Sequence, residues 1–121
     1  MINLAKFKNK KIIILGLGIE GISLVNFLYK HGISNLVICD QKSHNELQDQ
    51  LKQIKRKPEL ILGKNCFEKL LKLNDIDLIF RSPGISLNLP LIKELSSKIK
   101  ISSSTNLFFD LCPAKIIGVT G

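Results

Sequence analysis

Aromatic residues and arginine are scarce in this 121-residue sequence, which has no tryptophan, one tyrosine and two arginines among its 18 cationic residues. Few rings can therefore stack on unpaired bases, and only Arg56 and Arg81 offer the planar guanidinium that clamps phosphates or reads base edges. The other cations are lysines scattered along the chain, so the net charge of +8 does not mark a nucleic-acid-binding segment. We expect no nucleic-acid partner, although the positive field would attract a small anion.

Long apolar runs are absent as well. No segment approaches the roughly 20 apolar residues of a membrane-spanning helix, and the N-terminal M-I-N-L-A-K lacks the features of a signal peptide. We expect a cytoplasmic protein without a membrane partner.

Cysteine is limited to Cys39, Cys66 and Cys112, an odd number of distant residues without a C-x-x-C motif or a histidine at ligand spacing. Neither a disulfide nor a metal site is predicted. The thiols are expected to pack as small apolar side chains.

Short apolar runs alternate with segments of helical periodicity, in a chain that is 45% hydrophobic and long enough for one domain with its own core. The apolar runs predict strands at 11–16, 36–40, 59–62, 77–81, 99–102 and 115–119. The periodic segments predict helices from about 22 to a stop at Gly32, at 46–57, 65–73, 90–98 and 105–111, with Pro90 at a first helical position. This alternation predicts an α/β fold, a Rossmann-like open doubly wound parallel sheet of about five strands with helices on both faces.

A glycine motif, G-L-G-I-E-G at residues 16–21, lies between the first predicted strand and the first helix. Gly16 would make the tight turn, Gly18 would let backbone approach a phosphate, and Gly21 would let the helix pack closely on the sheet. The helix N-terminus would offer N–H groups and partial positive charge to a diphosphate. The motif predicts a phosphate site, and a glycine turn that merely suits packing is the alternative.

Asp40 ends the second predicted strand, about twenty residues after the glycines. A carboxylate at this place binds the ribose of a dinucleotide, accepts a hydrogen bond from a pyrimidine nucleotide, or only caps the following turn. Gln41 and Lys42 follow on the same rim, in position to contact a base edge.

A second polar segment, Ser82, Pro83 and Gly84, follows the fourth predicted strand, and open α/β sheets bind ligands beyond the carboxyl ends of their strands. It would present a hydroxyl and backbone N–H groups to the ligand of the glycine loop, unless it is a plain turn. Arg81 would either reach a phosphate or project outward. No catalytic triad, carboxylate pair or metal cluster is visible, so the sequence predicts a binding site without catalytic residues.

Four segments together resemble the N-terminal domain of the Mur ligases, and the resemblance covers nearly the whole chain. They are I-I-I-L-G-L-G-I-E-G, V-I-C-D, R-S-P-G-I with P-L-I-K-E-L, and L-F-F-D-L-C-P-A-K-I-I-G-V-T-G. Within that family the resemblance is to the type that adds D-glutamate. The S-P-G-I and terminal P-A-K-I-I-G-V-T-G motifs are specific, whereas the glycine loop is not.

The resemblance implies that residues 1–113 bind the UDP part of UDP-MurNAc-L-Ala, and that residues 114–121 begin a central ATP-binding domain, with Thr120 and Gly121 opening its phosphate loop. The diphosphate would lie on the glycine loop, the uracil beside residues 40–42, and residues 82–84 would complete the pocket. The implied site residues are Gly18, Ile19, Glu20, Gly21, Asp40, Gln41, Lys42, Ser82, Pro83 and Gly84.

The resemblance also implies a longer parent enzyme, an ADP-forming carboxylate–amine ligase of peptidoglycan synthesis. That enzyme would use ATP and Mg²⁺ to activate the substrate carboxylate as an acyl phosphate, which the amine of D-glutamate attacks. These ligands would bind outside this chain, which is expected to be inactive alone, to hold no cofactor and to be a monomer.

Two residues depart from the family pattern. Glu20 stands where a small hydroxyl residue is common, and because its carboxylate would repel a diphosphate we expect the side chain to point outward. Lys42 stands where arginine is common, which removes planar stacking on a base.

Two other interpretations stay open. The unit from Gly16 to Asp40 would also suit an NAD(P)-binding module of a dehydrogenase or a potassium-transport regulator. A basic adaptor domain would bind no small ligand at all.

Overall fold

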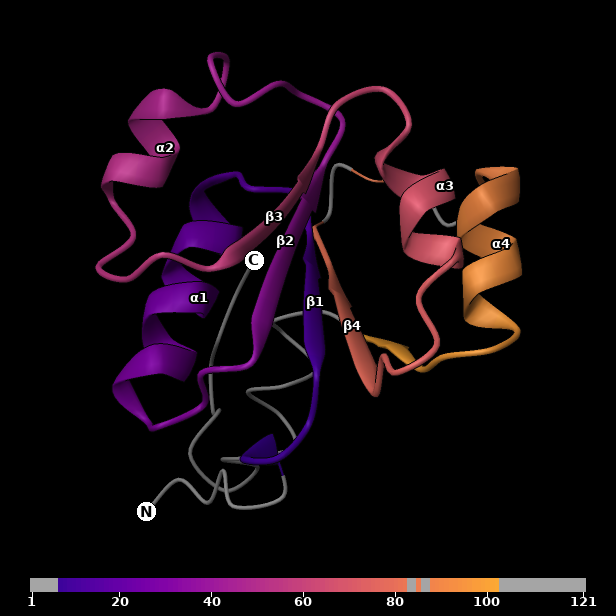
Figure 1. Ribbon diagram of the computed structural model, residues 1–121, viewed down its shortest axis with the longest axis horizontal. Helices are drawn as coiled ribbons and strands as arrows, with labels where there is room; N and C mark the ends of the chain where they lie inside the picture. Colours follow the sequence, from indigo (N-terminus) through magenta and orange to yellow (C-terminus); the bar gives the residue numbers. More distant parts are fainter. Residues whose placement is uncertain (1–6, 83–84, 86–87, 103–121) are drawn as a thin grey trace, which may run out of the picture.

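The computed structural model describes residues 7–82, 85 and 88–102 of the chain, and in these residues strands and helices alternate (Figure 1). The elements are β1 (Ile12–Leu15), α1 (Ile19–Lys30), β2 (Leu36–Asp40), α2 (Gln48–Lys52), β3 (Glu59–Leu62), α3 (Cys66–Leu71), β4 (Leu78–Arg81), α4 (Pro90–Ser96) and β5 (Ile101–Ser102).

The strands form one parallel sheet in the order β3-β2-β1-β4-β5. The chain builds outward from β1 to β3, then crosses to the other side of β1 for β4 and β5, so the strand order reverses between β1 and β4. In register, Leu15 at the end of β1 lies beside Cys39 of β2 and Arg81 of β4. The predicted doubly wound α/β fold is confirmed, and the carboxyl ends of three strands meet at one edge.

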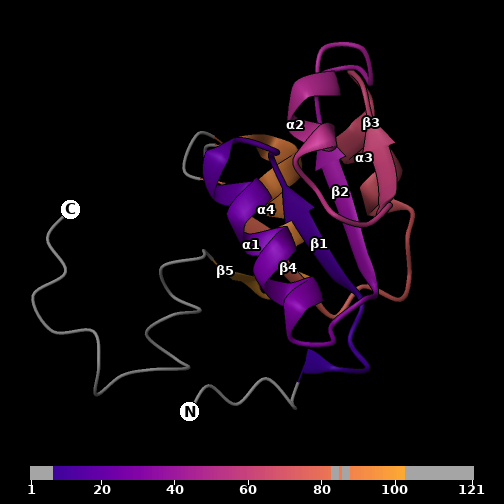
Figure 2. The ribbon, with the colours of Figure 1, turned by 90° about the vertical axis from the view of Figure 1, so that its left-hand side faces the viewer.

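Helices cover both faces of the sheet, with α1 and α2 on one side and α3 and α4 on the other (Figures 1 and 2). Successive side chains of β1 point to opposite faces, so Ile12 and Ile14 pack in the cluster with α1, whereas Ile13 and Leu15 pack with α3 and α4. A strand between two helical layers must be apolar at every position, which explains the continuous run I-I-I-L.

The predicted helix at 46–57 is wrong in its extent, because α2 covers only Gln48–Lys52. Beyond α2, the side chain of Asn26 on α1 binds the backbone that would otherwise continue the helix. Its amide donates to the Gln53 carbonyl (2.9 Å), and its oxygen accepts from the Lys55 N–H (3.2 Å). The apolar positions of the predicted helix are nevertheless used, since Leu47 and Ile54 are both buried in the core.

The remaining elements agree with the sequence at their centres. Residues 36–40 and 59–62 are strands with the predicted bounds, Pro90 opens α4, and β5 is shorter than predicted. The predicted helix at 105–111 and strand at 115–119 lie outside the described residues. None of the described helices is long and apolar enough to span a membrane.

Candidate functional site

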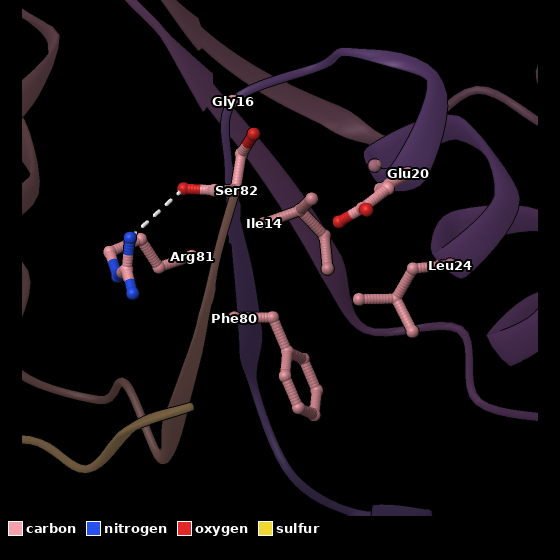
Figure 3. A pocket seen from close by; sticks show the side chains of 8 residues that line it. Ile14, Gly16, Glu20, Leu24, Phe80, Arg81 and Ser82 are labelled. Atoms are coloured by element: carbon pink, nitrogen blue, oxygen red, sulfur yellow. Dashed lines mark hydrogen bonds between the residues drawn. The ribbon is translucent and has the colours of Figure 1, made fainter. Parts of the chain in front are cut away.

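A small pocket opens where the strand order reverses, between the carboxyl ends of β1 and β4 and the first turns of α1 (Figure 3). It is lined by Ile14, Gly16, Glu20, Gly21, Leu24, Phe80, Arg81 and Ser82. Its floor comes from the sheet and its rim from the glycine loop and the residues that follow β4.

Each glycine of the loop has a different geometry. Gly16 has φ +92°, and a Cβ atom there would lie 2.7 Å from the Cβ of Ser82. A Cβ atom on Gly21 would lie 2.5 Å from the carbonyl oxygen of Gly16, so α1 can begin this close to β1 only with glycine at that position. Gly18, by contrast, has no atom within 4 Å of such a Cβ, and it faces open space. The turn at Gly16 and the close packing at Gly21 are as the motif predicts.

The start of α1 is exposed beside this open space. Gly18 is the N-cap residue, and no side chain caps the first turn. The helix has 12 residues, so its first N–H groups carry the partial positive charge that attracts anions. Ile19 in the first turn is 85% exposed, an unusual place for a large apolar side chain.

The carboxylate of Asp40 joins two backbone segments. One oxygen accepts the Leu17 N–H of the glycine loop (2.8 Å), and the other accepts the Lys42 N–H of the turn after β2 (2.9 Å). Asp40 thus caps the turn after β2, and its bond to the glycine loop was not predicted. The side chains of Gln41 and Lys42 are exposed on the same rim.

Ser82 continues β4 toward the glycine loop, with its N–H donating to the Leu15 carbonyl at 2.8 Å. Pro83 and Gly84 lie outside the described residues. The guanidinium of Arg81 turns back and donates to the carbonyls of Ile85 (2.7 Å) and Ser82 (3.3 Å), the latter drawn in Figure 3. Arg81 thus binds the backbone of Ser82 and Ile85 and does not project outward.

Glu20 corrects a further expectation. Its carboxylate points across the pocket toward Ile14 and Ser82 and not outward (Figure 3). Glu20 is the one acidic residue among those that line the pocket, so nothing there repels it, and the first turn of a helix favours a negative charge.

The two described cysteines are buried, as predicted, and both are free thiols. Cys39 of β2 and Cys66 at the start of α3 lie in the core cluster between the sheet and the helices α3 and α4, and their side chains hydrogen-bond to each other. That hydrogen bond, together with burial, raises the pKa of the Cys39 thiol, which makes it a poor nucleophile. Cys112 lies outside the described residues. Within the described part of the chain, no three His, Cys, Asp or Glu side chains gather as metal ligands.

Comparison with known proteins adds an independent finding. The model of the family "Mur ligase MurD-like, N-terminal domain" matches residues 10–102. A UDP-N-acetylmuramoylalanine–D-glutamate ligase of Alkaliphilus metalliredigens is 34% identical over 96% of this chain and 26% of the relative. Ligases of the same name from Clostridium tetani and Clostridium kluyveri are 37% and 38% identical, over 93% and 94% of this chain and 24% of each relative. The chain thus spans about a quarter of the length of the curated relatives it matches.

Proposed function

The chain belongs to the family of MurD-like N-terminal domains of the Mur ligases, and from this membership we propose that it binds the UDP part of UDP-MurNAc-L-Ala. In this proposal it is the substrate-binding N-terminal domain of a ligase that adds D-glutamate to that substrate in peptidoglycan synthesis.

One observation carries the proposal: three polar segments meet at the carboxyl edge of the sheet, beside the uncapped N-terminus of α1. The diphosphate would accept hydrogen bonds from the backbone of Gly18–Gly21, and Gly18 at the start of this segment has open space before it. The uracil would lie against residues 40–42, where Gln41 and Lys42 are exposed. Ser82 and the two residues after it would close the third side.

The rest of the reaction belongs to the parent enzyme. ATP and Mg²⁺ would convert the substrate carboxylate to an acyl phosphate, and the amine of D-glutamate would displace the phosphate. In this proposal residues 1–113 form the UDP-binding domain, and 114–121 begin the ATP-binding domain with Thr120 and Gly121 in its phosphate loop. We infer a cytoplasmic, monomeric enzyme, and expect the 121-residue polypeptide to turn over no ATP, because a quarter of the relatives' length holds only part of the machinery.

Separate titrations of UDP and NADH, followed by the shift in melting temperature, test the proposal. We expect UDP to stabilise the domain with a Kd of roughly 1 mM, about −4 kcal/mol, because the sugar and peptide of the natural substrate are missing. Low and moderate salt should both give this result, with weaker binding at moderate salt. Stronger stabilisation by NADH at equal concentration would replace the proposal with the dinucleotide-binding alternative.

A further inference from the structure

We propose that Asp40 is a positioning residue. Its carboxylate fixes the glycine loop in the shape that binds the diphosphate, and the uracil meets the backbone of residues 40–42 and not this carboxylate. The proposal rests on the proposed function, because it assigns a role within the same site. It concerns how the loop is held, which the glycine motif alone does not specify.

The first support is the position of Leu17, which lies between the turn at Gly16 and the N-cap at Gly18. Its side chain is 2% exposed and packs in the core against α1, while its N–H donates to Asp40 at 2.8 Å. Leu17 is therefore held from both sides, by apolar packing and by a charge-assisted hydrogen bond. Because Gly18 follows directly, fixing Leu17 also fixes where α1 begins.

The second support is the other oxygen of the carboxylate. It accepts the Lys42 N–H, and the N–H of Gly63 donates to the carbonyls of both Asp40 (2.9 Å) and Lys42 (3.2 Å). The turn at 40–42 is thus tied to the loop after β3 on one side and to the glycine loop on the other. A single carboxylate makes the proposed diphosphate and uracil segments one connected unit.

The third support is the sign of the charge. A carboxylate close to a diphosphate repels it, so an acid that served only as a nearby charge would weaken the site. Two of the acceptor positions of Asp40 are already taken by backbone N–H groups, which leaves fewer for a ligand. A positioning role explains why an acid stands here. It predicts that removing the charge weakens ligand binding, whereas repulsion alone predicts tighter binding.

The test compares Asp40→Asn and Asp40→Glu with wild type, using UDP and inorganic pyrophosphate as probes and the backbone amide signals of the labelled domain as readout. Asparagine keeps one acceptor but turns an NH₂ group toward the second N–H donor. Glutamate keeps the charge but moves it by one methylene. Glu59→Gln is the matched control. This exposed residue begins β3 at the amino ends of the strands, and its substitution changes the net charge as Asp40→Asn does.

We expect both Asp40 variants to weaken UDP and pyrophosphate about five- to twentyfold and by similar factors, whereas Glu59→Gln changes neither by more than about twofold. Amide hydrogen exchange at Leu17 or Lys42 should accelerate at least tenfold, with core amides such as Ile14 and Val25 unchanged. The exchange data separate a loosened loop from a loss of overall stability.

Tighter binding by Asp40→Asn would show that only the charge matters, and would overturn the proposal. Weaker binding of UDP with unchanged pyrophosphate would also overturn it, because Asp40 would then contact the base or sugar. If the wild-type domain binds neither probe, the proposed function fails, while exchange at Leu17 and Lys42 still decides whether Asp40 holds the loop.

Discussion

At the scale of single residues, the glycines of the loop separate into those that the fold requires and one that a ligand would require. Gly21 lies against the Gly16 carbonyl, where any Cβ atom would be 2.5 Å from oxygen. Gly18 meets no such obstacle. The sequence motif does not distinguish these glycines. In the structure, close packing requires glycine at position 21 and does not require it at position 18.

Gly21→Ala should therefore destabilise the domain by about 1–3 kcal/mol, because α1 must move away from β1 to admit the methyl group. Gly18→Ala should cost less than about 1 kcal/mol in stability, as an N-cap glycine replaced in open space. Denaturant unfolding of both variants checks this. Equal losses of stability would contradict the assignment of different roles.

Glu20 gives a second prediction at this scale, since its carboxylate faces the pocket that lies under the proposed diphosphate. Glu20→Gln should tighten UDP binding about two- to tenfold at low salt, and the gain should shrink as salt screens the repulsion. Titrations at two ionic strengths measure the effect. An unchanged or weaker affinity at low salt would mean that the diphosphate does not approach this loop.

At the scale of elements, a reciprocal pair of hydrogen bonds holds the turn that leads into α2. The Ser43 N–H donates to the Glu46 carboxylate (3.0 Å), and the Glu46 N–H donates to the Ser43 hydroxyl (3.3 Å). This is the capping box of helix N-termini, here formed one turn before α2. The hydrogen bond from the Ser43 N–H is the main reason that the pKa of Glu46 lies below its ordinary value of 4.5.

A lowered pKa means that the ionised form of Glu46 is favoured by folding, so its stabilisation is complete above about pH 4.5 and is lost as pH falls through the lower folded value. The difference in unfolding free energy between wild type and Glu46→Gln should therefore shrink on acidification below that pH. Unfolding curves from pH 6 to about pH 3 measure this difference. A difference that stays constant would exclude the capping role of the carboxylate.

Sequence patterns predict the bounds of elements that depend on local residues. They fail where a side chain distant in the sequence binds the backbone. The runs 36–40 and 59–62 became strands with the predicted bounds, because buried parallel strands are apolar at nearly every position. The helix predicted at 46–57 ended early because the side chain of Asn26 binds the backbone of Gln53 and Lys55, which are 27 and 29 residues away in the sequence. The pattern S-x-x-E at 43–46 was a signal for the cap that periodicity alone overlooked.

In the site, too, the features that depend on residue type were predicted and those that depend on distant contacts were not. The glycine motif predicted the tight turn at Gly16 and the close packing at Gly21, because those demands are encoded in the residue type. The bond from Leu17 to Asp40 joins residues 23 apart in sequence and depends on which way one carboxylate turns, so no spacing rule contains it. The directions of Glu20 and Arg81 were missed for the same reason.

At the scale of the whole molecule, the two edges of the sheet differ. At the amino edge, Lys11 is tied down, with its N–H donating to Asp77 (2.8 Å) and its ammonium group 3.2 Å from Asp75. At the carboxyl edge the strand order reverses, and the glycine loop and Ser82 surround a pocket. The strand order therefore places the uncapped N-terminus of α1 at the edge where doubly wound folds bind nucleotides.

The most direct test of this account is a map of the backbone amide shifts of the labelled domain during titration with UDP. We predict that the largest shifts occur at Leu17, Gly18, Gly21, Lys42 and Ser82. Amides at the amino edge, such as Asn35, Asp77 and Lys100, should not move. Saturable shifts centred on the amino edge, with the glycine loop unaffected, would contradict the central claim that the nucleotide binds where the strand order reverses.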